Sequence, residues 1–121
     1  MSPIIAPDAS RLLETPATVN RSLLWSEAIR AFVHDLRKRG YSVLTLRDYR
    51  SDIAQLSTMM PVLPSQVDEA LIEEAWHTLR RAGFGAAVLR RKRAAHHSFA
   101  QFLRERNRAE RICVTLWNRA A

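Results

Sequence analysis

Arginine is the residue type in this sequence best suited to chemistry with a ligand. Of 121 residues, 19 are basic and 17 of these are arginine; 12 acidic residues leave a formal net charge of +7. A guanidinium group offers a planar fork of donors that matches the oxygens of a phosphate. The composition therefore favours a polyanionic partner. An inert basic surface is the alternative, and the distribution of the charge has to decide between them.

The charge is distributed unevenly along the chain. Residues 66–79 contain four acidic and no basic side chains, whereas residues 80–111 contain ten basic and two acidic side chains. We expect the acidic segment to face away from any nucleic acid. The basic segment should form the centre of the binding surface.

Two predicted helix faces carry polar side chains opposite an apolar stripe. After Ser42, Arg47 and Ser51 share such a face, with Thr45 near its start and Arg50 on its flank. In the basic segment, the small side chain of Ala94 would allow close approach to DNA. These faces mix donors for phosphates with donors for base edges. The predicted DNA-binding residues are Thr45, Arg47, Arg50, Ser51, Arg90, Arg91, His97 and Gln101.

Tyr49 is the side chain that could act as a nucleophile on a phosphate. Such a tyrosine needs cations gathered on the scissile phosphate and an acid for the leaving oxygen. Tyr49 instead lies on the apolar stripe between Leu46 and Ile53, so we interpret it as a core residue. The sequence predicts no catalytic residue.

No metal or cofactor site is predicted. His96 and His97 are adjacent and point ~100° apart on a helix, so they cannot easily share a metal ion. We interpret His96 as a residue at the edge of the core and His97 as a surface or phosphate-contacting residue. Cys113 is the only cysteine, which excludes an internal disulfide and fits a reducing, cytoplasmic setting. No segment approaches the ~20 apolar residues that span a bilayer, so no membrane partner is expected.

An all-α fold is predicted to position these side chains, because glycine is scarce and β-branched runs are missing. Residues 1–20 contain three prolines and no helical period, so they are interpreted as a flexible leader to one domain at 21–121. Apolar steps of three and four predict a compact bundle of four main helices plus a short fifth helix. The predicted helices run from Ser22 to Gly40, from Ser42 to Met60, from a capping box of Ser65 and Asp68 to Gly83, from Gly85 to Arg106, and from Ala109 to Trp117.

The inward side of the fourth helix is predicted from its apolar residues. The inward candidates are Val88, Leu89, Ala95, Phe99, Phe102 and Leu103. Three tryptophans, Trp25, Trp76 and Trp117, also lie on apolar stripes, which favours packing over base stacking.

Three stretches, read together, resemble one family. They are LRKRGYSVLTLRDYRSDIAQL from Leu36, EEAWHTLRRAGFGAAVLRRKRAAH from Glu73, and SFAQFLRER from Ser98. In this order and spacing they resemble the N-terminal core-binding, SAM-like domain of tyrosine recombinases and phage integrases. The family has a Thr-Leu-Arg-x-Tyr-Arg-x-Asp motif, followed later by an arginine-rich helix that ends in Phe-x-x-Phe-Leu. The first motif is matched by Thr45, Leu46, Arg47, Tyr49, Arg50 and Asp52, and the second by Arg91, Phe99, Phe102 and Leu103. The family usually has Leu at the positions of Arg93 and His96, so the buried side of the fourth helix is predicted only to within half a turn.

The resemblance implies a helical module that packs on one side of duplex DNA, with its second and fourth helices near major grooves. Catalysis in the family belongs to a separate C-terminal domain, so this chain is expected to bind DNA without being an enzyme. A stand-alone DNA-binding regulator is one alternative, and a protein-interaction module with an acidic partner is another. Exposed Ile112, Leu116 and Trp117 would allow the C-terminal helix to dock on a neighbouring recombinase protomer; the alternative is that this face closes the chain's own core.

Overall fold

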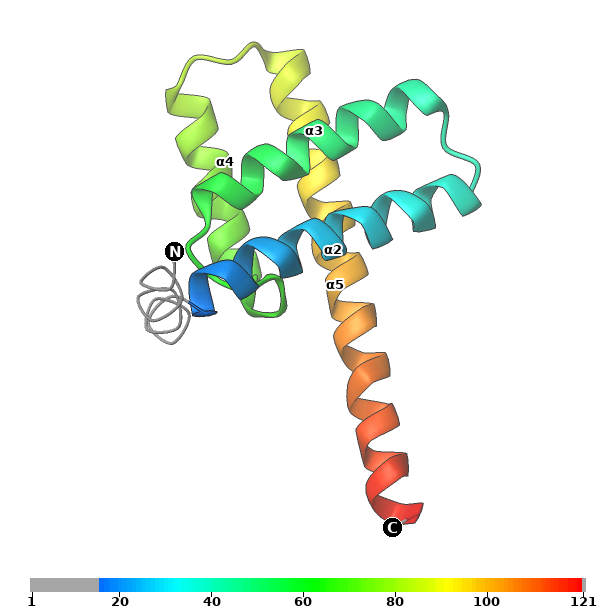
Figure 1. The fold of residues 1–121 in the computed structure, drawn as a ribbon. Helices are drawn as coiled ribbons and strands as arrows, with labels where there is room; N and C mark the ends of the chain where they lie inside the picture. The colour runs from blue at the N-terminus through cyan, green and yellow to red at the C-terminus, as the bar shows by residue number, and fades with distance from the viewer. Residues whose placement is uncertain (1–15, 121) are drawn as a thin grey trace, which may run out of the picture.

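The fold is an all-α bundle with one helix that projects from it (Figure 1). The computed structural model describes residues 16–120. Within them, the α-helices are α2 (Pro16–Lys38), α3 (Val43–Met59), α4 (Glu69–Arg81) and α5 (Ala86–Ala120), and a 3-10 turn, η1, spans Pro64–Gln66. Helices α2 and α3 run antiparallel and cross α5, and α4 packs alongside the first half of α5. The prediction of an all-α fold is confirmed.

Helix boundaries in the bundle follow from local chemistry. The hydroxyl of Ser42 accepts a hydrogen bond from the backbone N–H of Thr45 at 3.2 Å, so Ser42 caps α3 as predicted. Gly40 and Gly83 have φ angles of 89° and 92°, a region that favours glycine, and they follow the ends of α2 and α4. The cap of α4 is Asp68 alone, whose carboxylate accepts from the N–H of Leu71 at 2.9 Å. The predicted capping box with Ser65 is wrong, because Ser65 lies in η1.

Two predicted ends differ from the structure. Helix α2 begins at Pro16, not at Ser22, so residues 16–20 are helical although they were assigned to the leader. Residues 1–15 of that predicted leader lie outside the described residues. The separate fifth helix is also wrong, because α5 continues without interruption through residues 109–117. No glycine or proline occurs between residues 86 and 120 to end it.

The core of the bundle is built around Phe32 of α2. Its ring packs edge-on against Phe99 of α5 at 5.2 Å between centroids and lies 6.5 Å from Tyr49 of α3. Trp25 stacks on Phe99 at 5.8 Å, and its indole N–H donates to the carbonyl of Val62 at 2.8 Å. One aromatic cluster therefore joins three helices and the loop after α3, burying apolar surface from each.

The structure settles which side of α5 is buried. Of the six inward candidates, Ala95, Phe99 and Leu103 are buried, and Val88, Leu89 and Phe102 are half-buried. Lys92, His96 and Ala100 complete the buried side. The packing expected for Trp117 is wrong, because the part of α5 that carries it leaves the bundle and 75% of this side chain is exposed.

Candidate nucleic-acid interface

The outer face of α3 presents arginines to solvent. Arg47, Arg50 and Ser51 are exposed, and Thr45 is half-buried beside the helix cap, where its hydroxyl accepts from Ser42 at 2.9 Å. Within the described part of the chain, no acidic side chain forms an ion pair with Arg47 or Arg50. Both guanidinium groups therefore remain available to an external anion.

The outer face of α5 continues this pattern. Arg90, Ala94 and Gln101 are exposed, and they lie on one side of the helix with His97. The ring nitrogen Nδ1 of His97 lies 3.9 Å from the Glu69 carboxylate of α4, so His97 sits at the border with the acidic helix. Of the four predicted contacts on α5, Arg90 and Gln101 are the most open to solvent.

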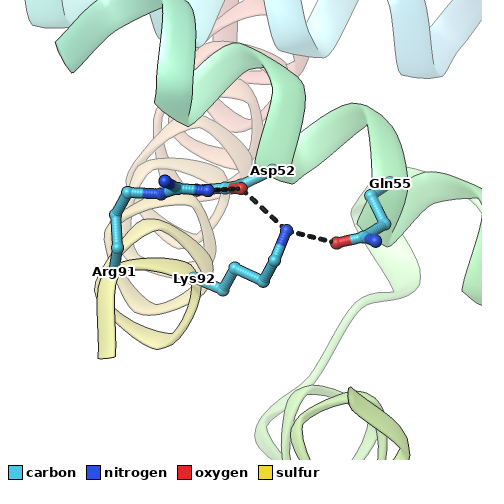
Figure 2. A network of polar contacts seen from close by, with 4 residues as sticks. All are labelled: Asp52, Gln55, Arg91 and Lys92. Carbon is cyan, nitrogen blue, oxygen red and sulfur yellow. Dashed lines mark hydrogen bonds and ion pairs between the residues drawn. The ribbon is translucent and has the colours of Figure 1, made fainter. Parts of the chain in front are cut away.

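Arg91, the remaining predicted contact, is part of an ion network between α3 and α5. Its Nε and Nη2 donate to the two oxygens of Asp52 at 3.0 and 2.9 Å, as Figure 2 shows. The side chain of Asp52 is only 1% exposed, whereas that of Arg91 is 39% exposed. The hydrogen bond to Asp52 raises the pKa of Arg91. This arginine therefore joins two helices, and part of its guanidinium group also reaches solvent.

Lys92 completes the network on its buried side. Its ammonium group donates to Asp52 at 3.0 Å and to the amide oxygen of Gln55 at 2.7 Å. Only 8% of the Lys92 side chain is exposed. A buried ammonium and a buried carboxylate are each costly to desolvate, and each compensates the other when both are hydrogen-bonded. The network therefore fixes how α3 sits on α5, and with it the relation between the two arginine-bearing faces.

This ion network was not predicted from the sequence, although the sequence contains one signal for it. Asp52 lies three residues after Tyr49 and four before Leu56, so it falls on the apolar stripe of an amphipathic helix, where a carboxylate needs a cationic partner. Its partners lie 39 and 40 residues further along the chain. No local periodicity could have identified them.

Helix α4 neutralises one flank of α5. Arg104 pairs with Glu69 at 2.8 Å, and Arg93 pairs with Glu73 at 2.9 Å. The guanidinium carbon of Arg93 also lies 4.3 Å from the ring centroid of Trp76. Glu69 and Glu73 are thus turned toward α5. Arg47, Arg50 and Arg90, by contrast, have no acidic partner among the described ion pairs.

The remaining candidate side chains have structural roles. Tyr49 packs between aromatic rings, and burial raises the pKa of its hydroxyl, which keeps it protonated. Both ring nitrogens of His96 are buried without a hydrogen-bond partner, and burial lowers its pKa to about 4. In residues 16–120, no group of three or more His, Cys, Asp or Glu side chains is placed to hold a metal ion. The described helices also include none long and apolar enough to cross a membrane.

The fold and this surface define a small all-α module with a basic face. A family model described as phage integrase, N-terminal SAM-like domain, matches residues 29–107. The match covers well over half of the chain, so the chain belongs to this family, and the resemblance seen in the sequence is confirmed. Searches of curated proteins and of solved structures found no match.

Proposed function

We propose that this chain binds duplex DNA as the core-binding module of a site-specific tyrosine recombinase or integrase. The observation that carries the proposal is that residues 29–107, the part that matches the integrase domain, include both faces with unpaired arginines. Phosphate contacts supply most of the affinity of such a module, and arginine is well suited to them.

The predicted contacts have different roles in this proposal. Arg47, Arg50 and Arg90 bind phosphates and position the module on the duplex. Arg91 contributes the part of its guanidinium group that Asp52 leaves free. The uncharged and weakly basic side chains sample base edges or support the arginines. These are Thr45, Ser51, His97 and Gln101.

Strand cleavage is assigned in this proposal to a separate catalytic domain of the recombinase. Phosphoryl transfer needs cations gathered around an in-line nucleophile. Tyr49, the sequence candidate for that nucleophile, is packed against Phe32. In this proposal the chain acts by placing DNA, in a reducing, cytoplasmic setting that its single cysteine fits.

The proposal includes contact between neighbouring protomers through the far end of α5. Trp117 and Leu116 are 75% and 57% exposed there. Sedimentation of the complex on a long duplex should show more than one protomer bound cooperatively, and Trp117→Ser should reduce that cooperativity. Independent binding by the parent protein would remove this part of the proposal.

A salt titration tests the DNA-binding role directly. Fluorescence anisotropy with a labelled 30-base-pair duplex should give a slope of log affinity against log salt of about −3 or steeper, because each neutralised phosphate contributes roughly −0.9. The triple variant Arg47→Gln, Arg50→Gln, Arg90→Gln should flatten the slope by between about two and three. A flat slope for the parent protein, or binding to polyglutamate in preference to DNA, would favour the protein-partner alternative.

The matched control removes the same charge from another surface. Arg30, Arg37 and Lys38 are exposed on α2, on the side opposite its buried residues. Changing all three to Gln alters the net charge equally but should leave the slope nearly unchanged. An equal loss in the control would mean that binding follows total charge and not the proposed faces.

A further inference from the structure

The second half of α5 projects beyond the bundle. Helix α5 is one 35-residue helix, and all its described side chains from Arg108 to Arg119 are exposed. Figure 1 shows this part, coloured orange to red, extending away from the other helices. It also lies beyond residues 29–107, the part that matches the family domain. Residues 108–119 therefore do not contribute to the core of the bundle, and a function for them requires a contact outside it.

The projecting part continues the polar face of the bundle. Starting at Arg90, steps of four and three residues keep one side of an α-helix in register. The positions reached are Arg90, Ala94, His97, Gln101, Arg104, Arg108, Arg111, Thr115 and Arg119. All are exposed except His97, which is half-exposed, and none is acidic. We call this set the α5 stripe.

The acidic residues of this region lie off the stripe. Glu110 is 3.9 Å from Arg106, on another side of the helix. Glu105 lies on a flank of α5. The hydrogen bond to Asp35 raises the pKa of Arg39, and Glu105 is close enough to Arg39 to add to that rise. Arg104 is the stripe arginine that pairs with Glu69. The charge of Arg108, Arg111 and Arg119 is therefore not offset along the stripe.

We propose that Arg108, Arg111 and Arg119 bind the phosphates of the same duplex, beyond the segment held by the bundle. This inference rests on the proposed function, because the stripe is continuous with the face that carries Arg90. At ~1.5 Å per residue, the part from Arg108 to Arg119 extends the stripe by roughly 17 Å. With a rise of about 3.4 Å per base pair, that adds about five base pairs to the contact. An acidic protein would also attract these arginines, but the continuity with the proposed interface favours DNA.

The test compares two sets of charge removals on the same 30-base-pair duplex. The tail variant is Arg108→Gln, Arg111→Gln, Arg119→Gln, and the reference is the α2 control Arg30→Gln, Arg37→Gln, Lys38→Gln. We expect the tail variant to flatten the slope of log affinity against log salt by between about two and three, and the control to leave it unchanged. Glutamine is a good helix former, so circular dichroism should show that both variants stay helical.

A charge-preserving variant separates phosphate binding from a structural role. Arg108→Lys, Arg111→Lys, Arg119→Lys keeps three cations and should retain most of the slope, since the release of counterions depends on charge. A loss of the slope in the lysine variant as well would overturn the inference.

The remaining outcomes distinguish this inference from the function on which it rests. If the bundle variant at Arg47, Arg50 and Arg90 flattens the slope but the tail variant does not, the inference is wrong and the proposed function stands. If the parent protein binds duplex DNA with no salt dependence, both are wrong. If the tail variant loses binding to polyglutamate while its DNA binding is unchanged, the tail faces an acidic polypeptide and the inference is wrong.

Discussion

Arginines have different roles in two neighbouring regions of this molecule. At the junction of α3 and α5, Arg91 is fixed by a carboxylate that is itself buried. Along the outer faces of the same helices, Arg47 and Arg90 have no acidic partner among the described residues. The two groups are close in sequence and identical in chemistry. The two groups differ in whether a buried carboxylate forms an ion pair with the arginine. An arginine-rich helix therefore cannot be treated as a uniform binding surface.

The largest effect should follow from removing Asp52. In Asp52→Ala the ammonium of Lys92 keeps its buried position but loses its counterion, and breaking a buried pair in this way costs about 3–5 kcal/mol. Urea denaturation followed by circular dichroism would measure this loss in the free energy of unfolding. Arg47→Gln on the exposed face should change the free energy of unfolding by less than about 0.5 kcal/mol. A loss below about 1 kcal/mol in Asp52→Ala would mean that the network does not hold the two helices together.

His96 should make the bundle sensitive to acid. Burial is the main cause that lowers the pKa of His96 to about 4. Asp52 acts in the opposite direction and raises this pKa, whereas Lys92, Arg93 and His97 act in the same direction as burial. The unfolded chain, with a histidine pKa near 6.5, therefore binds more protons between pH ~6.5 and ~4. Stability should fall across that window as the pH is lowered, by about 3 kcal/mol in total, and His96 should contribute no loss above it.

The variant His96→Leu isolates this contribution from the titration of carboxylates. Its stability should depend less on pH than that of the parent protein between pH 6.5 and 4, with a gain in the free energy of unfolding that grows toward acid. Parallel curves for the two proteins over that range would show that His96 is not held neutral in the core.

Charge reversals should separate the two groups of arginines. Arg47→Glu and Arg90→Glu should each weaken duplex binding by roughly tenfold or more at ~0.1 M salt while the fold is retained. Arg91→Glu places a carboxylate against Asp52 and should lower the thermal midpoint as well. Equal thermal midpoints for Arg91→Glu and Arg90→Glu would contradict the distinction between fixed and available arginines.

The smallest effect is expected at Tyr49. Incubated with supercoiled plasmid, the chain should produce no nicked or religated products, and Tyr49→Phe should bind duplex DNA as the parent protein does. Removing this hydroxyl leaves the ring packed against Phe32. A covalent adduct between a DNA end and Tyr41 or Tyr49 would contradict the assignment of catalysis to another domain.

Much of the bundle could be predicted from the sequence because its signals are local. Ser42 marks the start of α3, Gly40 and Gly83 mark helix ends, and steps of three and four residues identify Phe32, Ile53 and Phe99 as core. The outer positions of Arg47 and Arg90 follow from the same periodicity, since a residue opposite an apolar stripe is exposed.

The parts that could not be predicted depend on distant contacts or on missing ones. The pairing of Asp52 with Arg91 and Lys92 joins residues about forty positions apart, so only the packing of α3 on α5 reveals it. For the apolar residues near Trp117, both packing on the chain's own core and docking on a neighbour were expected from the sequence. An apolar stripe does not show whether a partner element exists, and Trp117 is 75% exposed. The continuity of α5, which aligns Arg108 with Arg90, was hidden by the prediction of a separate fifth helix.

Nuclear magnetic resonance of the ¹⁵N-labelled chain, titrated with a 30-base-pair duplex, tests the central claim most directly. The account predicts that amide shifts change along the outer faces of α3 and α5, around Arg47 and Ser51 and from Arg90 to Gln101, and disappear as salt is raised. The exposed side of α2 around Arg30 and Lys38 should stay unperturbed. Shifts confined to α2 or α4, or no shifts at low salt, would contradict the claim that these two arginine faces bind DNA.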